Sequence, residues 1–252
     1  MSWISTVAGT SSPGLKLFCL PHAGSNPALF RGWRAQLPAD IELDLVCYPG
    51  RLDLWRQPVP DSMAELVQAV AGAMAEYIDG EWAIFGHGMG AVVAHEAVTA
   101  LARRGVPPPA LLAVSAREAP QFHQPGSLYA GSDQELIDEL MRLGGTDPAL
   151  LAMPEMRRLI LPVLRADYGL IERWRPDALQ PVSCPIAAFV GSSDPKLDDA
   201  QVRGWSEWTT ASFTLDSFSG GHLYFSPDPQ PLIERLRARL DEVQGSGWAR
   251  HS

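Results

Sequence analysis

Six short apolar runs, separated by segments with helical periodicity, constrain the fold of this 252-residue chain more than any other feature. The runs are nearly continuous in apolar residues, which is typical of strands covered on both faces of a mostly parallel sheet. Segments such as 62–78 and 230–243 carry apolar side chains on one helical face. This alternation predicts an α/β fold, with a mostly parallel sheet and helices on both of its faces. The six runs are LKLFCL (15–20), LDLVCY (43–48), WAIFG (82–86), ALLAVS (110–115), PIAAFVG (185–191) and SFTLDSF (212–218).

The segment from about residue 127 to 176 interrupts this alternation because it contains helical patterns and no strand. Ser132 and Glu135 have the spacing of a capping box, and Pro162 is expected to kink or split the second helix. A helical insertion between two strands predicts a lid over a substrate cleft, with an extra packing layer as the alternative. We expect residues 1–252 to form a single domain whose ends, 1–13 and 245–252, are loose.

Charge and composition exclude several classes of function. A net charge of −9 argues against nucleic acid as a partner. The chain has no apolar run near the roughly 20 residues that span a membrane. The first residues lack a basic region ahead of an apolar stretch, so we expect no secretory signal. Cys19, Cys47 and Cys184 lack metal or C-x-x-C spacing, which favours free thiols in a reducing cytoplasm, and no metal site is predicted.

The sequence AIFGHGMGAVVAHE (83–96) predicts a strand, a sharp turn and a helix, with Gly88 at the centre of the turn. In α/β-hydrolases the corresponding pattern is G-x-S-x-G, and the turn presents a nucleophilic serine. Gly86 and Gly90 occupy the outer positions of this pattern, but Gly88 has no side chain. The central residue of such a turn is typically held at positive φ, a conformation that glycine adopts without strain.

Two polar residues further along the chain complete a hydrolase pattern. Asp194 follows the run 185–191 and His222 follows the run 212–218. Either residue alone is more often a simple loop residue, but nucleophile, acid and histidine in this order favour catalysis. His222 is the predicted general base and then general acid, and Asp194 is predicted to orient it. The loop PHAGS (21–25) follows the first apolar run and can direct a backbone N–H at the acyl oxygen, and Met89 directly follows the central turn residue Gly88. The N–H groups of Ala23 and Met89 are therefore predicted to form the oxyanion hole.

Taken together, these motifs resemble the type II thioesterases of polyketide and nonribosomal peptide assembly lines. The resemblance implies an α/β-hydrolase fold and an editing enzyme that hydrolyses acyl groups from the phosphopantetheine arm of acyl or peptidyl carrier protein domains. It implies no cofactor, and we expect a monomer. The matching pieces are LPHAGS (20–25), YPGR (48–51), GHGMG (86–90), LMRLGG (140–145), LPVLRADY (161–168), VGSSD (190–194) and SGGHLYF (219–225).

Two positions depart from the family pattern. Asn26 and Pro27 follow PHAGS, and Gly88 stands where the family has serine. Gly88 has three explanations: an engineered inactive variant, a native variant in which His222 activates water, or a catalytically silent protein that binds an acyl group or a carrier protein. Ser115 and Ser25 are weaker candidates for a substitute nucleophile. Acyl transfer to an amine or alcohol remains open as an alternative reaction.

Binding surfaces are less well defined by the sequence. An apolar acyl pocket bounded by the insertion is expected, and its candidate wall residues are Leu140, Leu161, Leu164 and Tyr168. Each of these four could equally be an ordinary core residue of a helix. Arg31, Arg34 and Arg51 are candidates for docking a carrier protein, with solvated surface charge as the simpler interpretation.

Overall fold

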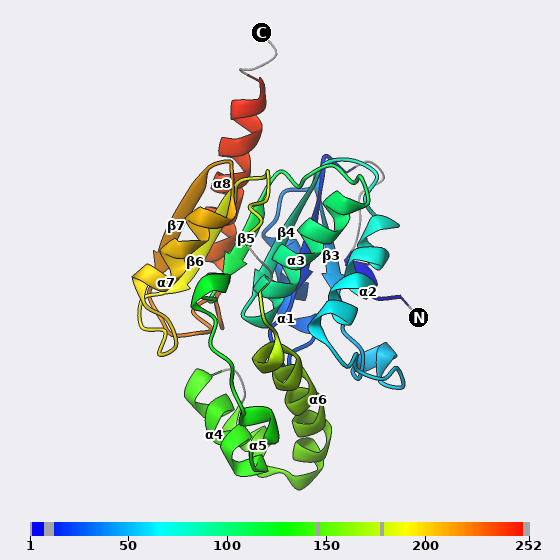
Figure 1. The fold of residues 1–252 in the computed structure, drawn as a ribbon, viewed down its shortest axis with the longest axis vertical. Helices are drawn as coiled ribbons and strands as arrows, with labels where there is room; N and C mark the ends of the chain where they lie inside the picture. Colours follow the sequence, from blue (N-terminus) through cyan, green and yellow to red (C-terminus); the bar gives the residue numbers. More distant parts are fainter. Residues whose placement is uncertain (1, 8–12, 145–146, 177–178, 249–252) are drawn as a thin grey trace.

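A computed structural model describes residues 2–7, 13–144, 147–176 and 179–248. Within these residues seven strands form one sheet in the order β1-β3-β2-β4-β5-β6-β7 (Figure 1). Strand β1 pairs with β3 in antiparallel fashion, and every other neighbouring pair is parallel. All six predicted runs are strands, and the α/β class is confirmed. The strands are Ile4–Val7, Leu15–Leu20, Ile41–Val46, Trp82–His87, Leu112–Ser115, Ile186–Gly191 and Phe213–Phe218, labelled β1 to β7.

The apolar runs are continuous because the sheet has a hydrophobic core on each face. In β2, Phe18 and Leu20 enter one core while Leu17 and Cys19 enter the other. The first core is covered by helices α2 and α3, and the second by α1 and α8. The helices are α1 Ala28–Arg31, α2 Met63–Ala75, α3 Met89–Arg103, α4 Asp133–Leu143, α5 Pro148–Ala152, α6 Pro154–Arg173, α7 Asp199–Arg203 and α8 Gln230–Trp248, and short 3₁₀ turns lie at Gly32–Ala35 (η1), Leu52–Leu54 (η2), Pro120–Phe122 (η3), Leu128–Ala130 (η4) and Gly204–Trp208 (η5).

Helices α4, α5 and α6, with η4, lie between β5 and β6 in the sequence, and we call them the insertion. They form a separate layer beyond one end of the sheet (Figure 1). The predicted capping box is present, since Ser132 Oγ accepts the Glu135 N–H and Glu135 Oε2 accepts the Ser132 N–H. Pro162 does not split α6, which runs unbroken for 20 residues. Its loss of one helical hydrogen bond is therefore tolerated within a helix whose apolar face is buried.

The prediction of a loose N-terminal end is wrong for residues 4–7. Residues Ile4–Val7 form β1, with Ile4 opposite Val46 in the register, and the Ile4 side chain is buried. At the other end, α8 continues to Trp248. Residues 1, 8–12 and 249–252 lie outside the described residues. A four-residue edge strand has too little periodicity to be recognised in a sequence, and its pairing partners lie about 40 residues away.

Candidate active site

Gly88 lies in the turn between β4 and α3, with φ +56° and ψ −116°. The predicted positive φ is therefore present at this position. The two outer glycines are required by close packing: a Cβ on Gly86 would lie 2.1 Å from the Gly90 carbonyl oxygen, and one on Gly90 would lie 2.3 Å from the Leu20 carbonyl oxygen. A Cβ on Gly88 would meet no backbone atom closer than 4.0 Å. Of the three glycines in the motif, Gly88 is the one with space for a side chain.

His222 faces this space. Its Nε2 lies 3.6 Å from the point that a Cβ of residue 88 would occupy. Its Nδ1 lies 2.8 Å from Asp194 Oδ2, and since a carboxylate only accepts, Nδ1 carries the hydrogen and Nε2 presents its lone pair. Asp194 is itself held by the Lys196 backbone N–H, which donates to Oδ1 at 2.9 Å. Tertiary structure thus brings together the three positions that the sequence analysis selected.

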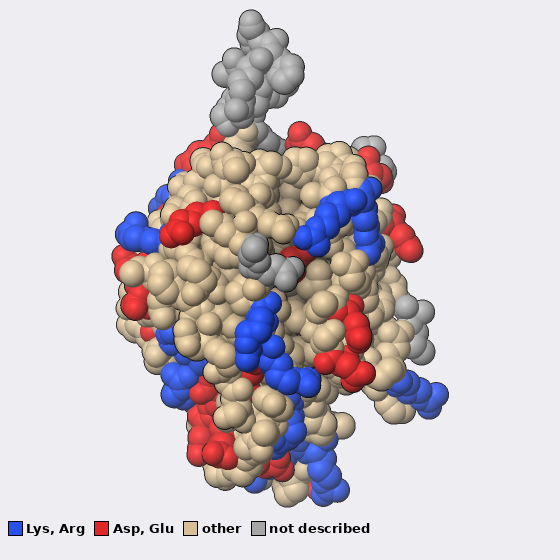
Figure 2. Space-filling model, viewed as in Figure 1, with Lys and Arg blue, Asp and Glu red and all other residues tan. Residues whose placement is uncertain are grey.

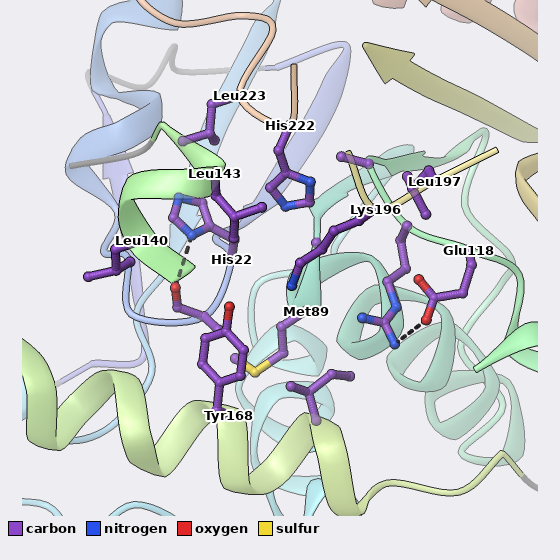
Figure 3. Close-up of a pocket in the computed structure, with 15 residues that line it drawn as sticks. His22, Met89, Glu118, Leu140, Leu143, Tyr168, Lys196, Leu197, His222 and Leu223 are labelled. Carbon is purple, nitrogen blue, oxygen red and sulfur yellow. Dashed lines mark hydrogen bonds and ion pairs between the residues drawn. The ribbon is translucent and has the colours of Figure 1, made fainter. Parts of the chain in front are cut away.

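A narrow cavity opens above Gly88, between the carboxyl ends of the strands and the insertion. Its volume is about 70 Å³. In Figure 3 the His222 imidazole lies on one side of it and Tyr168 of α6 on the other, with Leu140 and Leu143 of α4 along a third wall. This volume admits several water molecules, at roughly 10–15 Å³ each by this measure. It is well below the roughly 300–1,000 Å³ of typical ligand pockets.

The two predicted oxyanion-hole residues, Ala23 and Met89, both line this cavity. Met89 is the first residue of α3, where backbone N–H groups lack partners within the helix. Among the described residues, neither the Ala23 nor the Met89 N–H finds an acceptor. Both are therefore available to a ligand oxygen.

The acyl-wall predictions divide into two pairs. Leu140 and Tyr168 line the cavity, as predicted. Leu161 and Leu164 do not line this cavity, and both are buried in the insertion's own core, so their role as acyl walls stays a prediction. Helical periodicity cannot distinguish these cases, because a helix that packs on one neighbour and faces a cavity on another is apolar on both sides.

Three charged residues in the cavity wall were missed: Arg117, Glu118 and Lys196. Arg117 and Glu118 lie two and three residues beyond the end of β5, and Lys196 is two residues beyond Asp194. The rule that ligands bind at the carboxyl ends of parallel strands would have found them. Burial opposes ionisation of Glu118, but a hydrogen bond with His123 and the Arg117 charge outweigh it and lower its pKa to about 2. Arg117 and Glu118 form an ion pair at 2.8 Å.

Neither substitute nucleophile is placed to attack. Ser115 is fully buried, and its Oγ lies 2.9 Å from His87 Nδ1 and 2.7 Å from the Tyr224 hydroxyl. Ser25 and Ser115 are both absent from the cavity wall. His87 packs beneath the site, with its ring centroid 5.1 Å from that of His222. Burial lowers the pKa of His87 well below its ordinary value, which favours the neutral ring.

Among the proposed docking arginines, Arg51 is misassigned as a surface residue. Its side chain is buried and forms an ion pair with Asp167 of α6 at 2.7 Å. Arg34 donates to the backbone carbonyl oxygens of Pro38 and Ile41, whereas Arg31 is exposed. An arginine followed by a turn looks like surface charge in a sequence because its buried partner is 116 residues away.

Within the described ranges, no group of three histidine, cysteine, aspartate or glutamate residues is placed to hold a metal ion. The three cysteines are buried and free. No described helix combines the length and the apolar character needed to cross a membrane.

Comparison with known proteins adds an independent line of evidence. A sequence profile of the thioesterase domain matches residues 15–240. Thioesterase PikA5 of Streptomyces venezuelae is 34% identical over 251 residues, which cover 98% of this chain and 89% of the relative. The type II thioesterase BorB from the borrelidin biosynthetic cluster superposes with a TM-score of 0.87 at 32% identity, covering 94% of this chain and 97% of that one. YbtT, a type II thioesterase from the yersiniabactin NRPS/PKS pathway, superposes with a TM-score of 0.85 at 28% identity over 96% and 99%.

Proposed function

Because the chain belongs to the thioesterase family, we propose that it hydrolyses acyl thioesters carried on the phosphopantetheine arms of carrier proteins in polyketide or nonribosomal peptide biosynthesis. Full-length similarity to type II thioesterases of such pathways supports this substrate class. The single observation that carries the chemistry is the position of His222 Nε2, 3.6 Å from the Cβ site of residue 88 and backed by Asp194.

With Gly88 in place of serine, the attacking atom in this proposal is a water oxygen. Water in the space above Gly88 loses a proton to His222 Nε2 and adds to the thioester carbonyl carbon. Asp194 keeps the proton on Nδ1 and stabilises the imidazolium that forms. When the tetrahedral intermediate collapses, the C–S bond breaks and His222 returns the proton to the leaving thiolate. The products are a carboxylic acid and the free pantetheine thiol.

The Ala23 and Met89 N–H groups would stabilise the negative charge on the carbonyl oxygen during this addition. Both are backbone donors, so the absence of a side chain at residue 88 leaves them in place. One such donor contributes a factor of about 10²–10³ to kcat in hydrolases. This contribution would allow slow hydrolysis without a covalent intermediate.

The insertion would act as a lid in this reaction, because the present cavity is too small for a long acyl chain.

Surface charge does not by itself mark a docking surface for a carrier protein. Over the lower half of the face in Figure 2, where the insertion lies, basic and acidic side chains are intermixed rather than gathered into one patch. Charge alone therefore does not select a docking site on this face.

The experiment that tests the proposal compares the unchanged chain, Gly88→Ser, and each with His222→Ala. We expect Gly88→Ser to raise hydrolysis of acyl-carrier-protein thioesters by at least about 10²-fold, because a serine opens the covalent route. His222→Ala should abolish hydrolysis in both backgrounds. A Gly88→Ser protein that hydrolyses neither short-chain nor long-chain acyl thioesters would refute the proposal.

The missing nucleophile itself favours a second candidate, a silent protein that binds an acyl carrier protein. Under that alternative, the unchanged chain binds the carrier and Gly88→Ser restores no turnover. Acyl transfer is distinguished by adding an amine or alcohol acceptor and analysing the products, since hydrolysis yields only the free acid.

A further inference from the structure

The buried pair Arg51–Asp167 lies directly beside the active site. It joins the insertion to two segments of the rest of the domain, which we call the body. Asp167 lies on α6 and is fully buried, and Arg51 follows the short loop after β3. Arg51 Nη2 donates to Asp167 Oδ1 at 2.7 Å. No step of the proposed reaction uses either side chain.

Both members of the pair hold the loop that carries the Ala23 amide, residues 22–25, which we call the oxyanion loop. Asp167 Oδ2 accepts the Gly24 N–H at 2.8 Å, and Arg51 Nη1 donates to the Ser25 carbonyl oxygen at 2.6 Å. The loop is thus bound through its backbone, on the two residues that follow Ala23. Bonds to the backbone fix where the neighbouring amide lies.

The same helix also packs on this loop. Leu164, one turn before Asp167, approaches Gly24 so closely that a Cβ there would lie 2.5 Å from Leu164 Cδ1. Gly24 has φ +75°, which suits glycine alone without strain. The oxyanion loop is therefore held against α6 both by a hydrogen bond and by packing.

We propose that Asp167 is a positioning residue: from the insertion, it sets the place of the Ala23 N–H, so that the oxyanion hole is complete only when α6 is docked. This inference rests on the proposed function. It assigns the insertion a second role beyond covering the cavity, because lid position and oxyanion stabilisation become coupled. Removing the Gly24 bond should therefore lower kcat more than it changes KM.

The test compares Asp167→Asn with a matched control, Glu172→Gln, in the Gly88→Ser protein. Glu172 is also on α6 and also accepts from the backbone, through the N–H groups of Leu128 and Tyr129, but it does not touch the oxyanion loop. We expect Asp167→Asn to lower kcat about tenfold or more, and Glu172→Gln to leave it within about twofold. Equal effects of the two changes, or an effect confined to KM, would overturn the inference.

In Asp167→Asn the single amide oxygen should stay with the charged Arg51 donor, so its NH2 group faces the Gly24 N–H and that bond is lost. Because Arg51 then lacks a counter-charge, the variant can also lose stability. The double change Arg51→Met with Asp167→Leu removes both charges and keeps the site apolar, and should fold while kcat stays low. A double variant with unimpaired kcat would refute the positioning role.

Hydrogen exchange gives a readout that does not need turnover. Asp167→Asn should speed exchange in the peptide spanning residues 20–27, whereas Glu172→Gln should speed it at residues 128–129. If Gly88→Ser proves inactive, the proposed function fails, and the exchange pattern still decides whether Asp167 holds the loop. Unchanged exchange at residues 20–27 would overturn the inference on its own.

Discussion

At position 88 the chain has space for a side chain but a backbone that disfavours one. Its φ of +56° costs any residue other than glycine about 1–3 kcal/mol, and a Cβ there would lie 3.2 Å from His22 Cβ. We predict that Gly88→Ser and Gly88→Ala each lower the free energy of unfolding by about 1 kcal/mol or more. Chemical denaturation measures this, with Gly88→Ala separating backbone strain from any effect of the hydroxyl.

Gly105→Ala is the matched control for this strain. Gly105 also has positive φ, +78°, but nothing lies within 4 Å of its Cβ position. Gly105→Ala should lower the free energy of unfolding through backbone strain alone. Any larger decrease in Gly88→Ala therefore reports the contact with His22. Unchanged or higher stability of both Gly88 variants would show that the turn is not strained.

His22, beside Gly88, makes the protein sensitive to acid. Burial lowers its pKa to about 4, while its Nδ1 bonds to the Ala23 carbonyl oxygen. In the unfolded chain the His22 imidazole binds a proton near pH 6.5, whereas in the folded protein it stays neutral down to about pH 4. The folded state is therefore fully stable with respect to this group above pH 6.5 and loses stability as pH falls from 6.5 toward 4. We predict that His22→Gln reduces the slope of unfolding free energy against pH, between pH 4.5 and 6, by up to about 1.4 kcal/mol per pH unit.

Denaturant titrations of both proteins across this range measure that slope. Parallel slopes in the two proteins would show that His22 does not bind a proton on unfolding. Above pH 7 the two curves should run parallel, because His22 is neutral there in both the folded and unfolded states.

At the scale of elements, α4 is tied to the loop that carries Asp194. Glu139 of α4 forms an ion pair with Lys196 and accepts a hydrogen bond from the Tyr168 hydroxyl at 3.2 Å. Burial opposes ionisation of Glu139, but hydrogen bonds from Arg142 and Lys196 outweigh it and lower its pKa to about 2. The ion pair is therefore expected to hold the insertion against the body above about pH 4.5 and to release it as pH falls toward 2.

We predict that Glu139→Gln makes the insertion open more often, seen as several-fold faster limited proteolysis within residues 128–173 at neutral pH. Glu155→Gln is the control, because its pair with Arg158 is 3.6 Å long and both side chains are exposed. Exposed pairs contribute little, so this change should not alter cleavage. Equal cleavage of both variants would exclude a role for Glu139 in docking the insertion.

At the scale of the whole molecule, the small volume enclosed between body and insertion limits the acyl group. With about 70 Å³ above Gly88, a short acyl chain fits with little movement and a longer one needs the insertion to shift. We predict that kcat/KM of the Gly88→Ser protein falls with acyl length, and that Leu143→Ala raises it at least about fivefold for long chains only.

Leu159→Ala is the control for this experiment. This substitution removes the same leucine side-chain atoms from α6 as Leu143→Ala removes from α4. The Leu159 side chain is 69% exposed and does not line the cavity. A rise for long chains in both variants would point to general loosening of the insertion. No length dependence in the Gly88→Ser protein would show that the cavity does not select the acyl group.

Membership of the thioesterase family, predicted from motifs, is confirmed by the profile match over residues 15–240. The predicted mostly parallel sheet is confirmed by the structure. The catalytic roles of Asp194 and His222, and of the Ala23 and Met89 amides, stay predictions, although the structure brings these residues together around Gly88. The monomeric state, the carrier-protein partner and the absence of a cofactor also remain predictions.

The sequence by itself determined the six longer apolar strands, the main helices between them and the order of the candidate site residues, because periodicity and turn chemistry are local. It could not assign Arg51, Leu161 or Leu164, nor find Arg117, Glu118 and Lys196 as cavity residues. Only the tertiary structure decided those, since burial and ion pairing depend on partners distant in the chain. The same reason hid Asp167: its roles depend on Gly24 and Arg51, and only packing of α6 against the body brings the three together.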